Sequence, residues 1–284
     1  MRVLVLGATG MLGHDLIGTA PPGIALFPFS RAQLDITVSN ALAATVKDAK
    51  PDVIINAAAY TAVDKAESDP GRCYSVNLHA VGELGRIAVR NGAAVAHVST
   101  DYVFDGEASQ PYTESSQTHP MNVYGASKLA GEEALLRTGA TSLIVRTQWL
   151  FGLHGRSFPY TMWERALAGS RSSVVADQFG RPTYTVDLAH AIWKLIAFKV
   201  RGVVNVANIG VATWYEVARR VYSATNATEL VHPCATADFV TPARRPRWSV
   251  LDTARFEAIV GSSLPTWQDG LDRFLRCLHA AARE

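Results

Sequence analysis

The chain has 284 residues, of which 48% are hydrophobic and 18% are charged, and its formal net charge is +2. This composition is typical of a globular enzyme and excludes a disordered chain. The small net charge argues against a nucleic-acid partner, and no apolar run approaches the roughly 18 residues of a membrane span. Because the first apolar run is too short for a signal-peptide core and the three cysteines are widely spaced, we expect a cytoplasmic protein without disulfides or membrane contact.

The first half of the chain alternates short apolar runs with helical patterns. The runs suit strands buried on both faces of a parallel sheet, and they cover residues 3–6, 24–29, 53–56, 94–98 and 143–145. The clearest helical stripe covers residues 72–90 and ends at an Asn-Gly stop signal. This alternation predicts an α/β fold with a Rossmann-type doubly wound parallel sheet.

The second half changes character after about Trp149. Helical patterns at 158–168, 185–198 and 213–222, a strand pattern at 203–206 and a C-terminal amphipathic helix follow each other, and the proline-containing stretch 232–248 predicts little regular structure. We therefore expect a Rossmann domain over residues 1–150, with a segment near 178–210 returning to it, and a smaller mixed α/β lobe over residues 151–284.

A glycine-rich turn directly follows the first predicted strand. Gly7, Gly10 and Gly13 permit a tight turn, a close approach of the backbone to a pyrophosphate, and close packing of strand and helix. The alternative is a tight strand–helix turn with a structural role alone, which could occur anywhere in a chain. Because the motif lies at the first strand of a βαβ unit, we predict that it binds a dinucleotide.

The end of the second predicted strand bears on the choice of cofactor. An acid there would bind the ribose hydroxyl of NAD, but the residues are Ser30 and Arg31, and no acid occurs before Asp35. An arginine suits a 2′-phosphate. The sequence therefore favours NADPH, with NADH possible and a surface role for Arg31 as the alternative.

Three side chains suggest carbonyl chemistry. Tyr124 and Lys128 lie four residues apart on one face of a predicted helix, and an ammonium near a phenol would lower the phenol pKa and allow proton exchange with a carbonyl. Ser99 and Thr100 end a strand at the edge where ligands bind. Since adjacent strand residues point to opposite faces, only one of these two hydroxyls should reach the site.

The order of glycine loop, strand-end hydroxyl and Tyr-Lys pair resembles the extended short-chain dehydrogenase/reductase family. Longer motifs narrow the resemblance to the dTDP-4-dehydrorhamnose reductase family, and they cover essentially the whole chain, at residues 56–67, 99–106, 177–183, 244–246 and 249–253. The resemblance implies NADPH-dependent reduction of the C4 ketone of dTDP-4-dehydro-L-rhamnose to dTDP-L-rhamnose.

The same resemblance implies roles for individual residues. Thr100 would be the active hydroxyl, Tyr124 the proton donor, and Lys128 the residue that binds the nicotinamide ribose and tunes Tyr124. The cofactor would also contact Gly7, Gly10, Met11, Leu12, Gly13, Ser30, Arg31, Asp35, Ile36, Ala57 and Ala58. The sugar nucleotide would contact Thr61, Val63, Thr100, Asp101, Tyr102, Trp149, Arg181, Arg244 and Arg245. For Trp149, core packing between the two domains is an equally open interpretation.

Three other functions are compatible with the same fold. Dehydratases of the family carry Thr-Asp-Glu, and this chain has Tyr102 in place of the glutamate, which disfavours dehydration. A 4-keto reductase for another dTDP-deoxysugar stays open. A non-catalytic NADP-binding regulatory subunit, like the relative that partners methionine adenosyltransferase, is disfavoured because the residues of the proton relay are present.

Two further residues carry expectations. Some family members form dimers through a metal held by acids near the first helix, but Asp15 has His14 beside it and no evident acidic partner, so we predict no metal ligands and leave Mg²⁺ and a homodimer open. Asn77 lies on the apolar stripe of its helix, and a buried amide must be hydrogen-bonded. We expect Asn77 to hold backbone rather than to act in catalysis.

Overall fold

The computed structural model describes residues 1–281 and has a six-stranded sheet at its centre. The strands follow the order β10-β5-β4-β3-β1-β2, and every pairing between them is parallel. Their bounds are Arg2–Leu6 for β1, Ala25–Phe29 for β2, Val53–Asn56 for β3, Ala94–Thr100 for β4, Ser142–Thr147 for β5 and Gly202–Asn205 for β10. The predicted doubly wound parallel sheet is confirmed.

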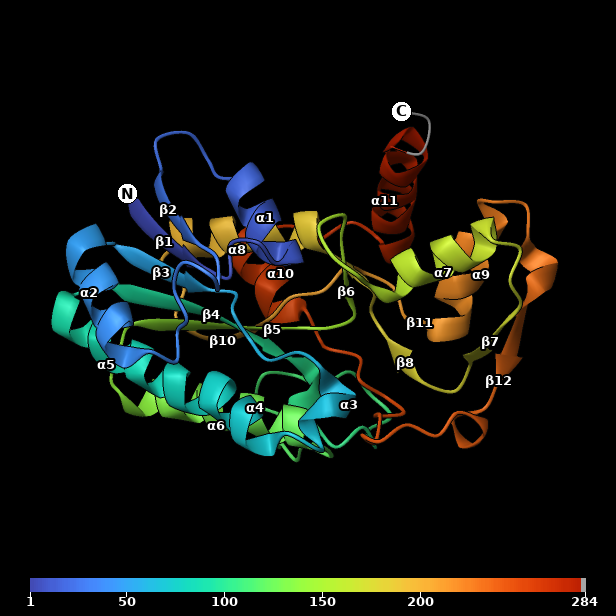
Figure 1. Ribbon diagram of the computed structural model, residues 1–284, viewed down its shortest axis with the longest axis horizontal. Helices are drawn as coiled ribbons and strands as arrows, with labels where there is room; N and C mark the ends of the chain where they lie inside the picture. The colour runs from blue at the N-terminus through green and yellow to red at the C-terminus, as the bar shows by residue number, and fades with distance from the viewer. Residues whose placement is uncertain (282–284) are drawn as a thin grey trace.

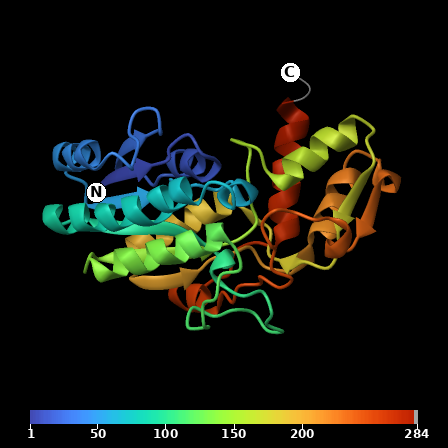
Figure 2. The same ribbon diagram turned by 60° about the horizontal axis from the view of Figure 1, so that its bottom comes forward.

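Helices cover both faces of this sheet, as Figures 1 and 2 show. One face carries α1 (Met11–Gly18), α8 (Thr185–Ala197) and α10 (Ala254–Val260), and the other carries α2 (Ser39–Ala49), α5 (Ala80–Asn91) and α6 (Val123–Arg137). Val3 and Val5 pack toward the first layer, whereas Leu4 and Leu6 pack toward the second. Successive strand residues point to opposite faces, so burial on both sides explains the uninterrupted apolar runs.

The direction of the chain across the sheet reverses at β1. This strand lies between β2 and β3, so the connections that follow β1 and β3 leave toward different layers. In open α/β sheets, ligands bind at such a switch point, outside the carboxyl ends of the strands. The fold therefore predicts a binding site beside the loop that follows β1.

A smaller unit lies beside the carboxyl edge of the sheet (Figure 1). Its helices α7 (Phe158–Leu167), α9 (Trp214–Ser223) and α11 (Trp267–Ala281) surround an apolar cluster that includes Trp163, Tyr222 and Phe274. Its short strands are β6 (Leu150–Phe151), β7 (Ser172–Val175), β8 (Phe179–Gly180), β9 (Thr183–Tyr184), β11 (Ala212–Thr213) and β12 (Val231–Cys234). Strand β12 pairs with β7 and takes only the first three residues of the stretch 232–248. Apart from a 3-10 turn at Thr236–Asp238, the rest of that stretch has little regular structure, as predicted.

Several segments of the second half return to the sheet. Helix α8 and strand β10 lie in the layers of the sheet, and α10 packs beside them through Phe256. The sequence predicted a return near 178–210 but not α10, which is only seven residues long. A helix this short has too few turns to show a clear apolar period.

The helix predicted over 72–90 is divided by a π-helical turn. Helix α4 (Pro70–Tyr74) runs into the π turn at Ser75–His79, and α5 follows. Within that turn Asn77 is 1% exposed; its side chain accepts the Tyr60 backbone N–H (2.9 Å) and donates to the Tyr60 carbonyl (3.1 Å). The predicted backbone clasp is confirmed. A single π turn escapes sequence analysis because it shifts the apolar stripe by only one residue.

Among residues 1–281, no helix is long and apolar enough to cross a membrane.

Candidate active site

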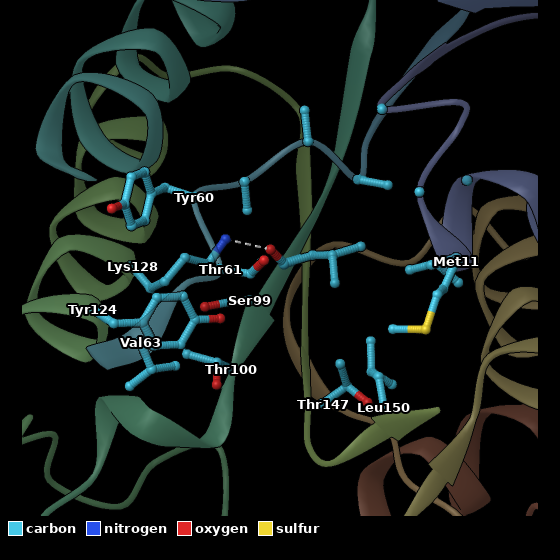
Figure 3. A pocket seen from close by; sticks show the side chains of 18 of the residues that line it. Met11, Tyr60, Thr61, Val63, Ser99, Thr100, Tyr124, Lys128, Thr147 and Leu150 are labelled. Carbon is cyan, nitrogen blue, oxygen red and sulfur yellow. Dashed lines mark hydrogen bonds between the residues drawn. The ribbon is translucent and has the colours of Figure 1, made fainter. Parts of the chain in front are cut away.

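A cavity of about 740 Å³ lies at the carboxyl edge of the sheet. It collects nineteen of the predicted site residues, namely Gly7, Gly10, Met11, Leu12, Gly13, Arg31, Asp35, Ile36, Ala57, Ala58, Thr61, Val63, Thr100, Asp101, Tyr102, Tyr124, Lys128, Trp149 and Arg245. Figure 3 shows Tyr124 and Lys128 on one wall, and Met11, Thr147 and Leu150 on the wall across from them. Ser30, Arg181 and Arg244 lie outside this lining.

The glycine loop forms the floor of one end of the cavity. Gly7 has φ +83°, and a Cβ there would lie 2.8 Å from the Ala58 nitrogen, while a Cβ at Gly13 would lie 2.1 Å from the Gly7 oxygen. Only glycine fits these two close approaches. Helix α1 begins at Met11 without a side-chain cap, so its first amides remain available for an anionic ligand. These features fit a dinucleotide diphosphate.

Arg31 and Asp35 lie beyond this loop, at the end of β2. The Arg31 side chain is 65% exposed, and its Nε lies 3.6 Å from Asp35 Oδ2. Hydrogen bonds from the Thr37 hydroxyl and amide, with a smaller effect of Arg31, hold the pKa of Asp35 below its usual value. Ser30 is directed elsewhere, because its hydroxyl donates to Gln33 Oε1 (2.8 Å). The arginine is therefore the group at this end with freedom to meet a ligand.

The Tyr-Lys pair stands at the start of α6. Asn122 caps this helix by accepting the Gly125 N–H (2.8 Å), which places Tyr124 in the first turn. Lys128 is 2% exposed, and its Nζ donates to the Val98 carbonyl (2.7 Å; dashed line in Figure 3). The cap and this bond fix both side chains on the cavity wall.

The two strand-end hydroxyls have separate partners, as the alternation of strand residues predicted. Ser99 donates to the carboxylate of Glu132, which forms a buried ion pair with Arg146 (2.7 Å). Thr100 donates to Asp101 Oδ1 (2.9 Å) and accepts the Tyr102 N–H (3.2 Å). Both residues line the cavity, but the Ser99 hydroxyl is directed to Glu132 outside the lining, whereas the partners of the Thr100 hydroxyl line the cavity too.

Burial biases the ionisable groups of this wall toward their neutral forms. It raises the pKa of Tyr124 above its usual value, against the effect of a hydrogen bond with Thr100. The direction of the shift is thus opposite to the lowering by Lys128 that the helix spacing predicted. Burial lowers the pKa of Lys128 to about 8, although the Glu132 carboxylate acts in the opposite direction.

Asp101 shares this environment. Burial raises its pKa to about 7, and hydrogen bonds from Ser249 and Thr100 oppose the rise. Its Oδ2 is buried without a hydrogen-bond partner. A carboxyl group with this pKa can exist in either protonation state near neutral pH, so Asp101 can exchange the roles of acceptor and donor toward Thr100.

An aromatic stack closes the other end of the cavity. The Trp149 ring lies parallel to Trp214, with centroids 3.5 Å apart, and Phe158 meets Trp214 edge-on. A Cβ at Gly180 would lie 2.4 Å from Trp149 Cε2, so this glycine leaves room for the ring. Trp149 both packs between the two units and faces the cavity, and the two interpretations of it are compatible.

The predicted basic residues of the second half behave differently from one another. Arg245 lines the cavity and pairs with Asp64 (2.7 Å). Arg181 donates instead to Thr253 Oγ1 (3.0 Å), and Arg244 is exposed outside the lining. The structure therefore does not place Arg181 and Arg244 in the lining of this cavity.

Arg156 is a cavity residue that the sequence did not indicate. Its side chain is 83% exposed and lies 3.8 Å from Glu164. The preceding Gly155 passes so close to α1 that a Cβ there would lie 2.7 Å from Met11 Cγ. The only available signal was a basic residue in a loop rich in glycine and serine.

His14, Asp15 and His154 form a group that could hold a metal ion. One ligand atom of each lies within 4.8 Å of the others, the two imidazoles stack with centroids 3.3 Å apart, and Asp15 Oδ2 is buried without a partner. The sequence did not show that His154 joins the other two. Two imidazoles and one carboxylate suit a transition metal better than Mg²⁺, and the prediction of no metal ligands stays untested.

A doubly wound sheet with a glycine loop at its switch point and a Tyr-Lys pair beside a strand-end hydroxyl defines a reductase of the short-chain dehydrogenase type. The family described as RmlD substrate binding domain matches residues 1–280, and the chain belongs to this family.

Three relatives illustrate the match. The dTDP-4-dehydrorhamnose reductase of Sinorhizobium fredii is 36% identical and covers 98% of both chains. The probable dTDP-4,6-dihydroxy-2-methyloxan-3-one 4-ketoreductase of Streptomyces antibioticus is 39% identical over 95% of this chain and 93% of its own. The structure of the Bacillus anthracis dTDP-4-dehydrorhamnose reductase in complex with NADP is 37% identical, with a TM-score of 0.92 and coverage of 96% of this chain and 98% of its own.

Proposed function

We propose that this chain reduces the C4 ketone of dTDP-4-dehydro-L-rhamnose with NADPH and forms dTDP-L-rhamnose. The observation that carries the proposal is the single cavity that joins the glycine loop to Thr100, Tyr124 and Lys128. Relatives that cover nearly the whole chain are named for this reaction, and one of them was solved with NADP. A binding protein without chemistry would not require a half-buried phenol beside a buried lysine.

The cofactor would lie across the switch point. The first amides of α1 would receive the diphosphate, Ala57 and Ala58 would contact the cofactor from the end of β3, and Lys128 would contact the nicotinamide ribose. Bound NADPH would supply the hydride that reduces the ketone. Arg31 supports the choice of NADPH, because it is the exposed cation at the end of β2.

Tyr124 would deliver the proton that the reduced oxygen needs. Burial keeps its phenol protonated at neutral pH, so the group is a donor before the reaction begins. Transfer of this proton to the alkoxide leaves a buried phenolate, and the nearby ammonium of Lys128 would stabilise that phenolate and return a proton to it.

Thr100 would hold the ketone oxygen in place. In the present arrangement its only hydroxyl hydrogen goes to Asp101. When Asp101 is protonated, the carboxyl group can donate to Thr100 instead, and the threonine hydroxyl is free to donate toward the substrate. The pKa of about 7 makes this exchange accessible near neutral pH.

The deoxysugar and the nucleotide would occupy the aromatic end. Trp149 belongs to the aromatic stack, and Thr61, Val63 and Tyr102 line the same cavity. The ion pair of Arg245 with Asp64 leaves further guanidinium hydrogens for a diphosphate oxygen. For Arg181 and Arg244, a contact with the substrate would require movement from the positions that the structure gives them.

The proposal is tested by following NADPH oxidation with enzymatically prepared dTDP-4-dehydrorhamnose, with NADH in parallel. We expect rapid oxidation, formation of dTDP-L-rhamnose and a preference for NADPH. NADPH binding without oxidation would overturn the assignment of this substrate.

A second candidate is a 4-keto reductase for another dTDP-deoxysugar. The Streptomyces antibioticus relative, named as a probable 4-ketoreductase, matches this chain as well as the rhamnose enzymes do. The two functions share every residue of the proton relay and differ only in the shape of the sugar pocket. Direct competition between the two 4-keto sugars, measured as the ratio of their kcat/KM values, separates them.

A further inference from the structure

A buried histidine lies directly behind Lys128. His97 is 0% exposed on β4, and its Nε2 lies 3.3 Å from Lys128 Nζ. Its Nδ1 lies 3.1 Å from Nδ2 of Asn56, the residue beside it in the sheet on β3. Neither Asn56 nor His97 lines the cavity, so the proposed reaction gives neither of them a role.

The hydrogen bonds of Asn56 determine which nitrogen of His97 carries the hydrogen. Asn56 Oδ1 accepts the Ala58 N–H (3.1 Å). A flipped amide would turn its NH₂ group against that N–H, so Nδ2 must face the histidine. His97 Nδ1 is then an acceptor, and the hydrogen of the neutral ring lies on Nε2, facing Lys128.

This arrangement disfavours a charged lysine. An ammonium carries three hydrogens and has no acceptor, so an ammonium at Lys128 would oppose the Nε2–H of His97 with another donor. A neutral amine can accept from Nε2–H with its lone pair, donate one hydrogen to the Val98 carbonyl (2.7 Å) and direct the other into the cavity. The neutral amine satisfies every contact, and the ammonium leaves one unfavourable.

We propose that His97, fixed by Asn56 as the Nε2–H tautomer, is a positioning residue that makes Lys128 a readier proton donor by stabilising its neutral amine. The inference rests on the proposed function. When the alkoxide takes the Tyr124 proton, one Lys128 N–H bond breaks and the Tyr124 O–H bond forms again. His97 then donates to the lone pair left on Nζ, and solvent later restores the lysine proton.

Other groups around Lys128 act on the same equilibrium. Burial holds the pKa of His97 well below its usual value, with a smaller effect of Lys128, so the ring stays neutral. The titratable and charged groups that face Lys128 are His97 from β4, Cys73 from α4, Tyr124 and Glu132 from α6, and, through Glu132, Arg146 from β5. Glu132 raises the pKa of Lys128 and so favours the ammonium, and the effect of His97 opposes that of Glu132.

The test is a direct titration of Lys128. The chain has only six lysines, so ε-¹³C-lysine labelling gives few signals, and Lys128→Arg identifies the one from Lys128. In His97→Leu we expect the pKa of Lys128 to rise by about one unit, a tenfold change in its ionisation constant. A merely structural role predicts the opposite sign, because an apolar neighbour desolvates the ammonium and lowers that pKa.

Val95→Ala is the matched control. Val95 is buried two residues earlier on β4, on the same face of the sheet, within the apolar cluster of that layer. We expect no change in the Lys128 titration there, which removes loose packing as an explanation. An unchanged or lowered pKa in His97→Leu would overturn the inference.

A second measurement needs no variant. In ¹⁵N-histidine-labelled protein, the ring that does not titrate between acidic and neutral pH should show a protonated Nε2 and an unprotonated Nδ1. The opposite tautomer would overturn the inference even if His97→Leu fails to fold. Neither measurement uses the substrate, so a failure of the proposed reaction stays separate from a failure of this inference. If the proposed reaction and this inference both hold, kcat should fall at a higher pH in His97→Leu than in the parent, with little change in KM.

Discussion

The two sides of the cavity are built differently. On the side of β4 and α6, the polar groups are buried and held by named partners, as in the bonds of Lys128 to Val98 and of Thr100 to Asp101. On the opposite side, Arg31 and Arg156 are exposed and have only long contacts with carboxylates. The comparison indicates that the groups proposed for proton transfer are positioned before binding, whereas the groups proposed to hold the charged ligand would be positioned by it.

Among the substitutions on the side of β4 and α6, Tyr124→Phe should have the largest effect on turnover. We expect kcat to fall by roughly 10²–10⁴, because the variant removes the positioned proton donor. NADPH affinity, measured by quenching of protein fluorescence, should change little. Unchanged turnover would contradict the assignment of Tyr124 and would favour a regulatory subunit, for which this hydroxyl has no purpose.

A second break acts on the glycine loop. In Gly13→Ala, the new methyl group would lie 2.1 Å from the Gly7 oxygen, so α1 must move away from the loop. We expect NADPH affinity to fall by about tenfold or more, since 1.4 kcal/mol of displaced contacts already has this effect. Gly18→Ala is the control, because nothing lies within 4 Å of a Cβ there. Equal affinities in the two variants would show that the loop does not hold the cofactor.

Burial of Asp101 should make the stability of the protein depend on pH. Its pKa is raised from 3.8 to about 7 in the folded protein, so the native state binds more protons than the unfolded state between these values. The carboxyl group therefore costs no stability below about pH 4, and the cost grows as the pH rises toward 7. We expect Asp101→Asn to be more stable than the parent at about pH 8, by at most about 4 kcal/mol, and equal to it at about pH 4. Urea unfolding at both pH values measures this difference, and a gain of equal size at both would point to packing instead.

The smallest effect is expected on the exposed side. Arg31→Ala should reduce the preference for NADPH over NADH by about tenfold, because an exposed cation contributes little more than that to binding of a phosphate. The comparison of kcat/KM for the two cofactors measures it. Lys47→Ala on α2 serves as a control for the loss of one positive charge outside the cavity. An equal loss with both cofactors would assign Arg31 to some other contact.

The sequence indicated the ordered side of the cavity better than the exposed side. Parallel strands bury continuous apolar runs, so β3 was predicted with its observed bounds, and the residues after β1, β3 and β4 could be placed at one edge. The alternation of strand side chains also separated Thr100 from Ser99. Rules of this kind involve only residues that are close together in the chain, so they can be applied to the sequence alone.

The errors arise where distant segments meet. Arg156 reaches the cavity only because its loop passes over α1, and His154 meets His14 for the same reason. The helix spacing predicted a lowered pKa for Tyr124, but spacing does not reveal burial, which raises that pKa. Arg181 looked suitable by charge but is directed to Thr253 on another segment.

The return of α8, β10 and α10 to the sheet has a consequence for protein engineering. The chain passes between the large and the small unit several times, so neither unit is one continuous piece of sequence. A fragment that begins after residue 150 would carry an edge strand and two helices whose apolar faces belong to the other unit. An exchange of sugar specificity between relatives will therefore require transplanting several separate segments together, and a chimera with a single crossover will expose the core of both units.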